Sequence, residues 1–289
     1  SAGDYRQADR QGAWRAQEVS VTAASPLPKT RSPLRVFVTG ASSGIGAALA
    51  RHYARSGAAV GLAARREEDL CKLAGEISAL GGEASIFPLD VTDAAALAAA
   101  AEVYVSRFGV PDVVIANAGV SAGTLTEHGE DLVVFRQIMD TNVLGMAATF
   151  APFIAGMREA PGAEGRRLVG IASVAGIRGL PGAEAYSASK AAAIAYLESL
   201  RLEMRLSGIK VVTIAPGYIA TPMTEVNPYR MPFLLQADDA AQRFAAAIAR
   251  GVSYTVIPWQ MGIVAKLLRL LPNALYDRLF VNAPRKPRR

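Results

Sequence analysis

One short stretch constrains the fold more than any other part of the sequence. Residues 35–39 form a β-branched and aromatic run, which predicts a buried strand. Glycines follow at positions 40, 44 and 46, and the alanine-rich segment 47–53 predicts a helix. A strand, a glycine turn and a helix in this order form a phosphate cradle, because the turn lets a phosphate approach and the helix N-terminus offers free N–H groups. The alternative is a glycine turn that only packs the helix on the strand.

Strands and helices continue to alternate along the chain. Further strands are predicted at 57–64, 84–89, 112–116, 167–172, 210–215 and 254–257. Helices are predicted at 67–80, 93–108, 130–157, around 186–206 and at 238–250. This alternation predicts one α/β domain over residues 35–289, a doubly wound parallel sheet with helices on both faces. Residues 218–235 are loop-like and rich in proline, which makes them a candidate lid over a substrate.

Polar residues collect where the predicted strands end. Gly40, Arg65, Asp90 and Asn117 all fall at such ends, beyond which parallel sheets bind their ligands. Arg65 and Arg66 follow the second strand, no acidic residue stands at Ala63 or Ala64, and Glu67 comes only after the arginines. In a dinucleotide site, arginine at this place suits the 2′-phosphate of NADP, whereas an acid would hold the ribose 2′-hydroxyl of NAD. NADP is therefore favoured and NAD less so; a solvated helix start is the alternative, for Arg66 more than for Arg65.

Tyr186 and Lys190 are four residues apart, so on a helix they share one face. A phenol has an ordinary pKa of about 10, and a nearby ammonium favours the phenolate and lowers that pKa toward the range that acid–base catalysis needs. The pair alone is weak evidence, because such pairs are common on solvated helices.

Composition narrows the class of protein. The net charge is +6, but the basic residues concentrate near the two ends of the chain, so nucleic-acid binding is not expected. Cys71 is the single cysteine and no Cys/His cluster has metal-ligand spacing, so no metal site is predicted. Residues 1–34 are polar and proline-containing, which predicts a flexible N-terminal extension without a signal peptide. A cytoplasmic protein with no membrane-spanning segment is expected.

The C-terminal segment 258–289 is predicted to be a helical and basic extension. Its residues 259–280 carry apolar side chains at helical spacing, with Lys266 and Arg269 on one side. Three interpretations remain open: a core or subunit-contact helix, a wall of the substrate pocket, or an amphipathic helix that gives peripheral membrane contact.

Taken together, these motifs resemble the short-chain dehydrogenase/reductase family, from about residue 34 to residue 257. The resemblance rests on Thr39-Gly40-x-x-x-Gly44-Ile45-Gly46, Asn117-Ala118-Gly119, Asn142, Ser173, Tyr186-x-x-x-Lys190 and Pro216-Gly217, in the family's order. It implies a Rossmann fold and a catalytic set of Ser173, Tyr186, Lys190 and Asn142. Tyr186 would be the general acid or base, and Lys190 would lower its pKa and bind the nicotinamide ribose. Ser173 would hold the substrate carbonyl, and Asn142 would anchor a water that links Lys190 to solvent.

The resemblance also implies a cofactor groove. Its residues would be Gly40, Ser42, Ser43, Gly44, Ile45, Gly46, Arg65, Arg66, Asp90, Val91, Asn117, Ala118, Gly119, Tyr186, Lys190, Pro216, Gly217, Ile219 and Thr221. Two functions are compatible with these residues. The first is an NADP(H)-dependent oxidoreductase for a small-molecule carbonyl/alcohol pair, with an apolar or lipid-like substrate. The second is a non-catalytic NADP-binding sensor or scaffold, which would have no need of a tuned phenol. As in much of the family, the helices with Asn142 and Tyr186 are expected to form a homodimer or homotetramer.

Overall fold

The computed structural model describes residues 6–8, 14–16, 33–283 and 285–288, and the chain forms two compact units, 1–32 and 33–289. In the first unit, β1 (Arg6–Ala8) pairs antiparallel with β2 (Trp14–Ala16). The flexible extension predicted for residues 1–34 otherwise falls almost wholly outside the described residues.

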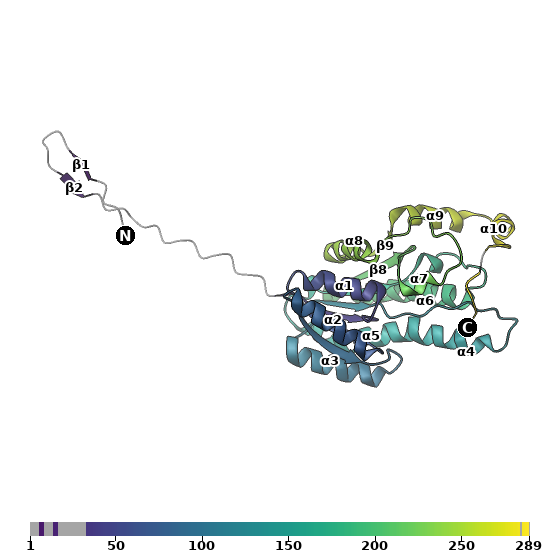
Figure 1. Cartoon of the computed structure of the whole chain (residues 1–289), viewed down its shortest axis with the longest axis horizontal. Coiled ribbons are helices and arrows are strands. Elements are labelled where there is room, and N and C mark those ends of the chain that lie inside the picture. Colours follow the sequence, from purple (N-terminus) through teal and green to yellow (C-terminus); the bar gives the residue numbers. More distant parts are fainter. Residues whose placement is uncertain (1–5, 9–13, 17–32, 284, 289) are drawn as a thin grey trace. The chain divides into compact units, whose positions relative to one another are not determined.

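The second unit is built on a seven-stranded parallel sheet in the order β5-β4-β3-β6-β7-β8-β9 (Figure 1). The strands are β3 (Arg35–Thr39), β4 (Ala59–Ala64), β5 (Glu83–Pro88), β6 (Val113–Ala116), β7 (Arg167–Ile171), β8 (Lys210–Pro216) and β9 (Tyr254–Ile257). The chain moves outward from β3 to β5, then returns to place β6 on the other side of β3. This reversal between β3 and β6 is the topological switch point at which such sheets bind ligands. The predicted doubly wound parallel sheet is confirmed.

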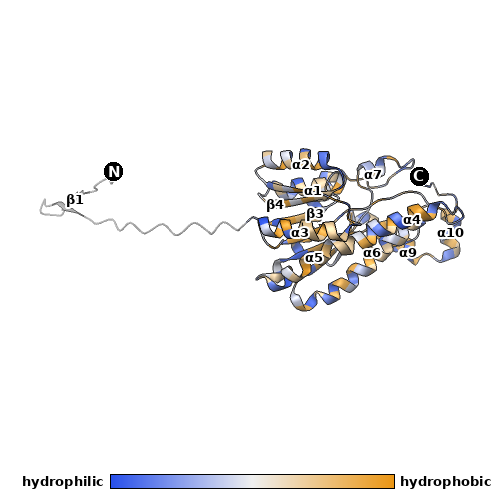
Figure 2. Ribbon diagram, turned by 90° about the horizontal axis from the view of Figure 1, so that it is seen from below, coloured by the Kyte–Doolittle hydropathy of each residue, from blue (hydrophilic) through white to orange (hydrophobic). Residues whose placement is uncertain are grey.

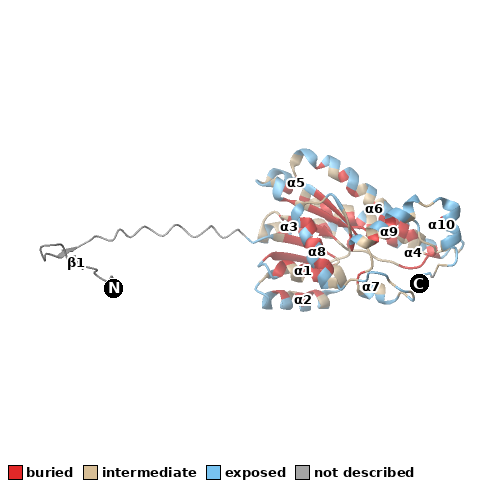
Figure 3. Ribbon diagram, turned by 90° about the horizontal axis from the view of Figure 1, so that it is seen from above, coloured by how far each residue is buried: buried red, intermediate tan, exposed pale blue. Residues whose placement is uncertain are grey.

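Helices cover both faces of the sheet. As a consequence, all strands except those at the edges are buried on both sides. One face carries α1 (Gly44–Ala54), α2 (Glu67–Ala79) and α8 (Ala237–Arg250). The other carries α3 (Ala94–Phe108), α5 (Gly145–Glu159) and α6 (Glu184–Glu203). Alternate residues of β3 divide between the two cores: Val36 and Val38 join the first and Phe37 joins the second. Figure 3 shows the buried residues concentrated along the sheet.

The long helix predicted over 130–157 is interrupted at its centre. It consists of α4 (Asp131–Met139), the π-helical turn η1 (Asp140–Leu144) and α5. π turns often mark functional sites, and this one contains Asn142. The span 131–159 is long and apolar enough to cross a membrane by length and composition alone. It packs as a core helix, however, with Met146, Phe150 and Phe153 buried against the sheet.

The C-terminal extension consists of two helices, α9 (Trp259–Leu270) and α10 (Asn273–Phe280), rather than one. The inner side of α9 belongs to the folded body, because Met261 and Ala265 are buried. Trp259 and Leu267 remain exposed on its outer side, and Figure 2 shows hydrophobic residues on α9 and α10 among charged ones. The predicted lid segment contains one short helix, α7 (Pro222–Glu225). Besides η1, the described fold contains three short 3₁₀ helices: η2 (Ala163–Gly165), η3 (Val174–Gly176) and η4 (Arg205–Ser207).

Candidate active site

A cleft of about 1200 Å³, measured to its solvent-open mouth, lies at the carboxyl ends of the strands. The structure brings most of the predicted site residues together in its lining. They are Gly40, Ser42, Ser43, Gly44, Ile45, Arg65, Arg66, Asp90, Val91, Asn117, Ala118, Gly119, Ser173, Tyr186, Lys190, Pro216, Gly217, Ile219 and Thr221. Gly46 and Asn142, which were predicted to join the site, do not line the cleft.

The glycine turn is held by close backbone contacts. Gly40 has a left-handed backbone (φ +66°), and a Cβ there would lie 2.8 Å from the Cα of Ala118. Asn117 fastens this turn: its Nδ2 donates to the carbonyl oxygens of Thr39 at 3.0 Å and Gly40 at 3.2 Å. A Cβ on Gly46 would lie 2.3 Å from the Gly40 carbonyl oxygen. Gly46 therefore allows α1 to pack against the glycine turn, and the Asn117 side chain holds that turn in place.

The N-terminus of α1 opens into the cleft. Its N-cap is Ser43, and within the described chain no side chain caps the first turn and no acidic residue lies in it. Ser43, Gly44 and Ile45 line the cleft at this point. Free N–H groups and the positive end of the helix dipole suit an anion here. The cradle therefore fits the pyrophosphate of a dinucleotide.

Two arginines stand at the tip of β4. The Nη1 of Arg65 lies 3.7 Å from an Oδ2 of Asp90, and the Arg65 side chain is 67% exposed. Arg66 donates to the Ser43 hydroxyl at 3.2 Å and also to Asp69. Both guanidinium groups thus line the cleft, and one of them reaches the glycine turn. Paired cations near a helix N-terminus can hold a second phosphate group.

Tyr186, Ser173 and Lys190 meet at the other end of the cleft. Lys190 Nζ donates to the carbonyl oxygen of Ile171 at 2.9 Å, and it lies 5.9 Å from the centre of the Tyr186 ring. Burial lowers the pKa of Lys190 to about 8. Burial also raises the pKa of Tyr186, while a hydrogen bond with Ser173 acts in the opposite direction.

The expected lowering of the Tyr186 pKa by Lys190 is not found in this structure. The reason is geometric: the Lys190 ammonium is directed to the end of β7 at Ile171, and burial dominates the phenol. An anionic ligand with ribose hydroxyls between the two groups would change both environments.

Asn142 is buried, and its side chain forms hydrogen bonds that connect the segments around the site. Its Oδ1 accepts from the Val120 N–H at 2.8 Å, and its Nδ2 donates to the Val120 carbonyl at 3.0 Å and to Ser189 Oγ at 3.0 Å. The Ser189 hydroxyl in turn donates to the Tyr186 carbonyl at 2.8 Å. Both amide hydrogens of Asn142 are thus committed to protein groups. The side chain fixes the backbone around Tyr186 and Val120.

Several cleft residues escaped the sequence analysis. They are Ala64, Leu89, Val120, Thr141, Ile171 and Ala172, whereas Pro222, Met223 and Thr224 lie in the segment 218–235 that the sequence predicts as a candidate lid. A local signal existed for α7, because Thr221 and Thr224 form a capping box around a proline at the first helical turn. Apolar residues such as Val120 carry no such signal. Among the described residues, no group of three or more His, Cys, Asp or Glu side chains could hold a metal ion.

Comparison with known proteins agrees with this geometry. A family model for short chain dehydrogenases matches residues 35–230, and the chain belongs to this family of oxidoreductases. An uncharacterized oxidoreductase of Myxococcus xanthus is 40% identical over 241 residues, which is 83% of this chain and 94% of that protein. An 11-beta-hydroxysteroid dehydrogenase-like 2 of Arabidopsis thaliana is 33% identical over 258 residues, 86% of this chain and 82% of the relative.

Two solved structures have the same fold. One is a 3-oxoacyl-[acyl-carrier protein] reductase of Brucella melitensis with bound NAD, at 30% identity and a TM-score of 0.67, covering 78% of this chain and 89% of the other. The second is an alcohol dehydrogenase of the archaeon Thermococcus sibiricus complexed with 5-hydroxy-NADP, at 27% identity and a TM-score of 0.68. It covers 78% of this chain and 95% of the other. The first of these structures contains NAD and the second contains 5-hydroxy-NADP.

Proposed function

We propose that this protein is an NADP(H)-dependent oxidoreductase that interconverts a ketone or aldehyde and an alcohol, with Tyr186 as general acid and base. One observation carries the proposal. Tyr186, Ser173 and Lys190 line the same cleft as an uncapped helix N-terminus and two arginines. A site for a dinucleotide and a proton-transfer group are thus neighbours.

The bound nicotinamide would supply or accept the hydride. In reduction, the Tyr186 phenol donates a proton to the carbonyl oxygen, and in oxidation the phenolate takes it back. Ser173 lies beside Tyr186 and can hold that oxygen as charge grows on it. Lys190 is buried beside them, and its charge would favour the phenolate once the ammonium turned from Ile171 toward the ring.

The preference for NADP rests on the tip of β4. Ala63 and Ala64 end the strand, so no carboxylate is placed there to receive a ribose hydroxyl. Arg65, Arg66 and Ser43 offer instead a cluster of donors at the same place. Guanidinium groups pair with phosphate through two parallel hydrogen bonds, which supports recognition of a 2′-phosphate.

The substrate side of the cleft supports an apolar or lipid-like molecule. Val120, Ile219 and Met223 line it. Val226, Phe233 and Leu234 lie exposed in the segment that follows, where they can cover an apolar body. Two similar proteins carry the names 11-beta-hydroxysteroid dehydrogenase-like 2 and 3-oxoacyl-[acyl-carrier protein] reductase, and a steroid or an acyl chain is an apolar body of the kind proposed here.

A turnover assay tests the proposal. The purified full chain is offered ketones and aldehydes of increasing apolar size with NADPH or NADH, and cofactor absorbance is followed. Reduction with NADPH, faster for bulky apolar carbonyls, is the expected result. Tight NADPH binding without reduction of any carbonyl would favour a non-catalytic sensor or scaffold instead.

We also propose that the protein self-associates through the surface of α4 and η1. Leu132, Val133 and Leu144 are large apolar side chains that stand exposed there. Burying them against a second copy would remove this surface from water. Light scattering at micromolar concentration is expected to give a dimer or tetramer mass, which Leu132→Glu together with Val133→Glu should reduce. A monomer for the unchanged chain would contradict the proposal.

We further propose a cytoplasmic protein whose helix α9 contacts anionic membrane surfaces. Trp259, Ile263, Leu267 and Leu270 form one outward stripe of α9, and Leu270 is 79% exposed. Lys266 and Arg269 flank the stripe. A second copy would bring like charges together, whereas anionic headgroups would neutralise them. The membrane is therefore the partner that both the apolar and the charged residues fit.

A further inference from the structure

The C-terminal segment 285–288, called here the C-terminal strap, returns to the substrate end of the cleft. The N–H of Gly123, in the loop after β6, donates to the carbonyl oxygen of Pro287 at 2.9 Å, and Gly123 pairs with Arg288 in a short parallel bridge. A Cβ on Gly123 would lie 2.2 Å from the Lys286 carbonyl oxygen. Position 123 therefore accommodates only glycine while the strap lies against it. Figures 1 and 3 both place this end of the chain beside α4.

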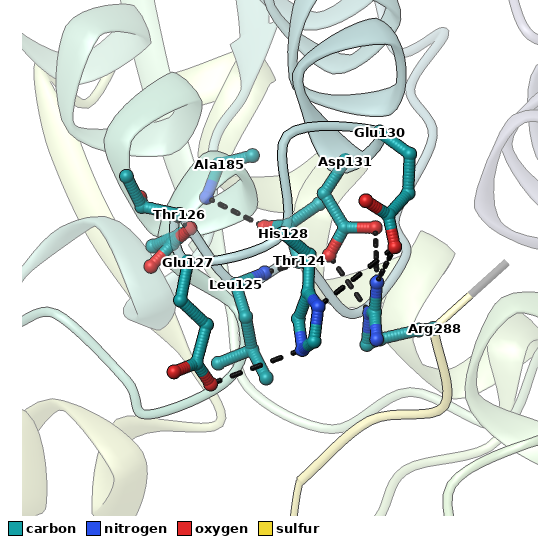
Figure 4. Close-up of polar contacts among 10 residues, drawn as sticks. Thr124, Leu125, Thr126, Glu127, His128, Glu130, Asp131, Ala185 and Arg288 are labelled. Carbon is teal, nitrogen blue, oxygen red and sulfur yellow. Dashed lines mark hydrogen bonds and ion pairs between the residues drawn. The ribbon is translucent and has the colours of Figure 1, made fainter.

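Arg288 anchors the strap. Its Nε and Nη2 donate to the two carboxylate oxygens of Asp131 at 2.9 and 3.0 Å, and Nη2 also reaches Glu130 at 2.9 Å (Figure 4). The Asp131 side chain is 5% exposed and also accepts from the Leu125 N–H at 2.8 Å. The guanidinium lowers the pKa of Asp131. The carboxylate is buried and is held by two parallel hydrogen bonds, while the Arg288 side chain is 36% exposed, so the geometry of the pair rather than its burial makes it an anchor.

Lys286 joins the two sides of the cleft mouth. Its Nζ donates to Ser121 Oγ at 3.0 Å and to the Met223 carbonyl at 3.2 Å. Ser121 follows the cleft-lining Val120, and Met223 lines the cleft from α7 on the other side. The helix α7 is only four residues long, and one helical turn is not stable by itself. Lys286 thus supplies α7 with a contact from outside its own segment.

The strap also reaches the loop before the catalytic tyrosine. A Cβ on Gly182 would lie 2.9 Å from Arg285 Cβ, and the Gly182 carbonyl accepts from the Thr124 N–H at 3.3 Å. The C-terminal strap therefore contacts three separate segments, at residues 121–124, 182 and 223.

We infer that the C-terminal strap is a latch that holds α7 across the substrate end of the cleft and limits the size of the substrate admitted. Lys286 and Arg288 act as positioning residues through Met223 and Asp131. The size limit rests on the proposed function, while the latch itself does not. A loosened strap would free α7 and weaken substrate binding, and it would leave the cofactor end, at Arg65 and Asp90, unchanged.

Hydrogen exchange tests the latch without any substrate. Gly123→Ala places a methyl group where the Lys286 carbonyl lies, whereas Gly129→Ala, a matched control in the same loop, meets nothing within 4 Å. In Gly123→Ala we expect amide exchange at 120–126 and at 221–226 to quicken by about tenfold, and in the control neither should change. Faster exchange at 120–126 with unchanged exchange at 221–226 would overturn the latch.

Kinetics test the limit on substrate size. For Arg288→Ala and Gly123→Ala we expect KM for a small carbonyl substrate to rise about five- to tenfold and KM for a bulky one to rise less or to fall, with kcat and the NADPH Kd within about twofold. In Arg288→Lys the rise in KM should be smaller than in Arg288→Ala, because the lysine ammonium can still pair with Asp131. An equal change in KM for small and bulky carbonyls, or no change for either, would overturn the size limit. Should the unchanged chain reduce no carbonyl at all, the proposed function falls, while the exchange result still decides the latch.

Discussion

The ammonium of Lys190 is bound to the carbonyl oxygen of Ile171, 2.9 Å away, at the point where β7 leaves the sheet. This contact ties the middle of α6 to the strand whose tip carries Ser173. Gly176 allows the approach, because a Cβ there would lie 2.5 Å from the Lys190 main chain. The proposed proton-transfer residues are thus placed by packing between one strand end and one helix.

Burial of Lys190 predicts a pH-dependent stability. Its pKa in the folded protein is about 8, below the ordinary lysine value. Between pH 8 and 10 the unfolded chain therefore binds a proton that the folded chain has released. By linkage, the unfolding free energy rises with pH in this window, by about 2 kcal/mol from pH 7 to pH 9.5. Urea unfolding of the ligand-free protein at the two pH values measures the rise.

The matched control for this prediction is Lys190→Met, which keeps the length of the side chain and removes the charge. The rise should then largely disappear, leaving the smaller contributions of other groups. An equal rise in both proteins would show that Lys190 is not the group that titrates. Measurements stay below pH 10, because tyrosines such as Tyr186 titrate above it and act in the opposite direction.

Arg65→Asp should shift the cofactor preference from NADPH toward NADH. The new carboxylate would repel a 2′-phosphate and could accept a ribose hydroxyl. We expect the ratio of the two dissociation constants to change by on the order of 10- to 100-fold. The control is Arg107→Asp, which also removes an arginine with one acidic partner, Glu83, but at a surface outside the cleft. Unchanged relative affinities for Arg65→Asp would assign 2′-phosphate recognition to Arg66 and Ser43.

Membrane contact through α9 can be measured by sedimentation with vesicles. The full chain should bind vesicles that contain anionic phosphatidylglycerol, less strongly at high salt, and bind neutral vesicles weakly. Leu267→Ser combined with Leu270→Ser should reduce binding several-fold. The control pair, Leu202→Ser with Leu206→Ser, removes two other exposed leucines, at the end of α6 and in η4. Equal loss in both pairs, or no binding at all, would contradict the proposal.

The fold was readable from the sequence because its signals are local. The residues 35–39 and 254–257 form the predicted strands without change of bounds. Periodicity also found α2, α3 and α8 to within a residue or so. The π turn at Asn142 was not predicted, because nothing in the local pattern reports that Gly145 must approach Val91. The break between α9 and α10 at Pro272 was also missed, although the proline could have indicated it.

The candidate site divides in the same way. Its glycines, Asn117, Ser173, Tyr186 and Lys190 stand at strand ends or one helical turn apart, so their convergence follows from topology. What they contact could not be read so directly. The Asn142 side chain donates hydrogen bonds to Val120 and Ser189, and the Lys190 ammonium donates one to Ile171. Tertiary contacts decide which hydrogen-bond partner a buried polar group finds. The strap was missed for the same reason, since Arg288 and Asp131 are 157 residues apart.

The rate of hydride transfer in Tyr186→Phe tests the central claim most directly. The substitution removes the phenolic hydroxyl and keeps the ring, so NADPH binding should stay within about twofold in a fluorescence titration. Single-turnover reduction of the best carbonyl substrate should slow by on the order of 10²- to 10⁴-fold, because proton donation in the transition state is lost. A rate equal to that of the unchanged protein would show that Tyr186 donates no proton, and it would contradict the proposed mechanism.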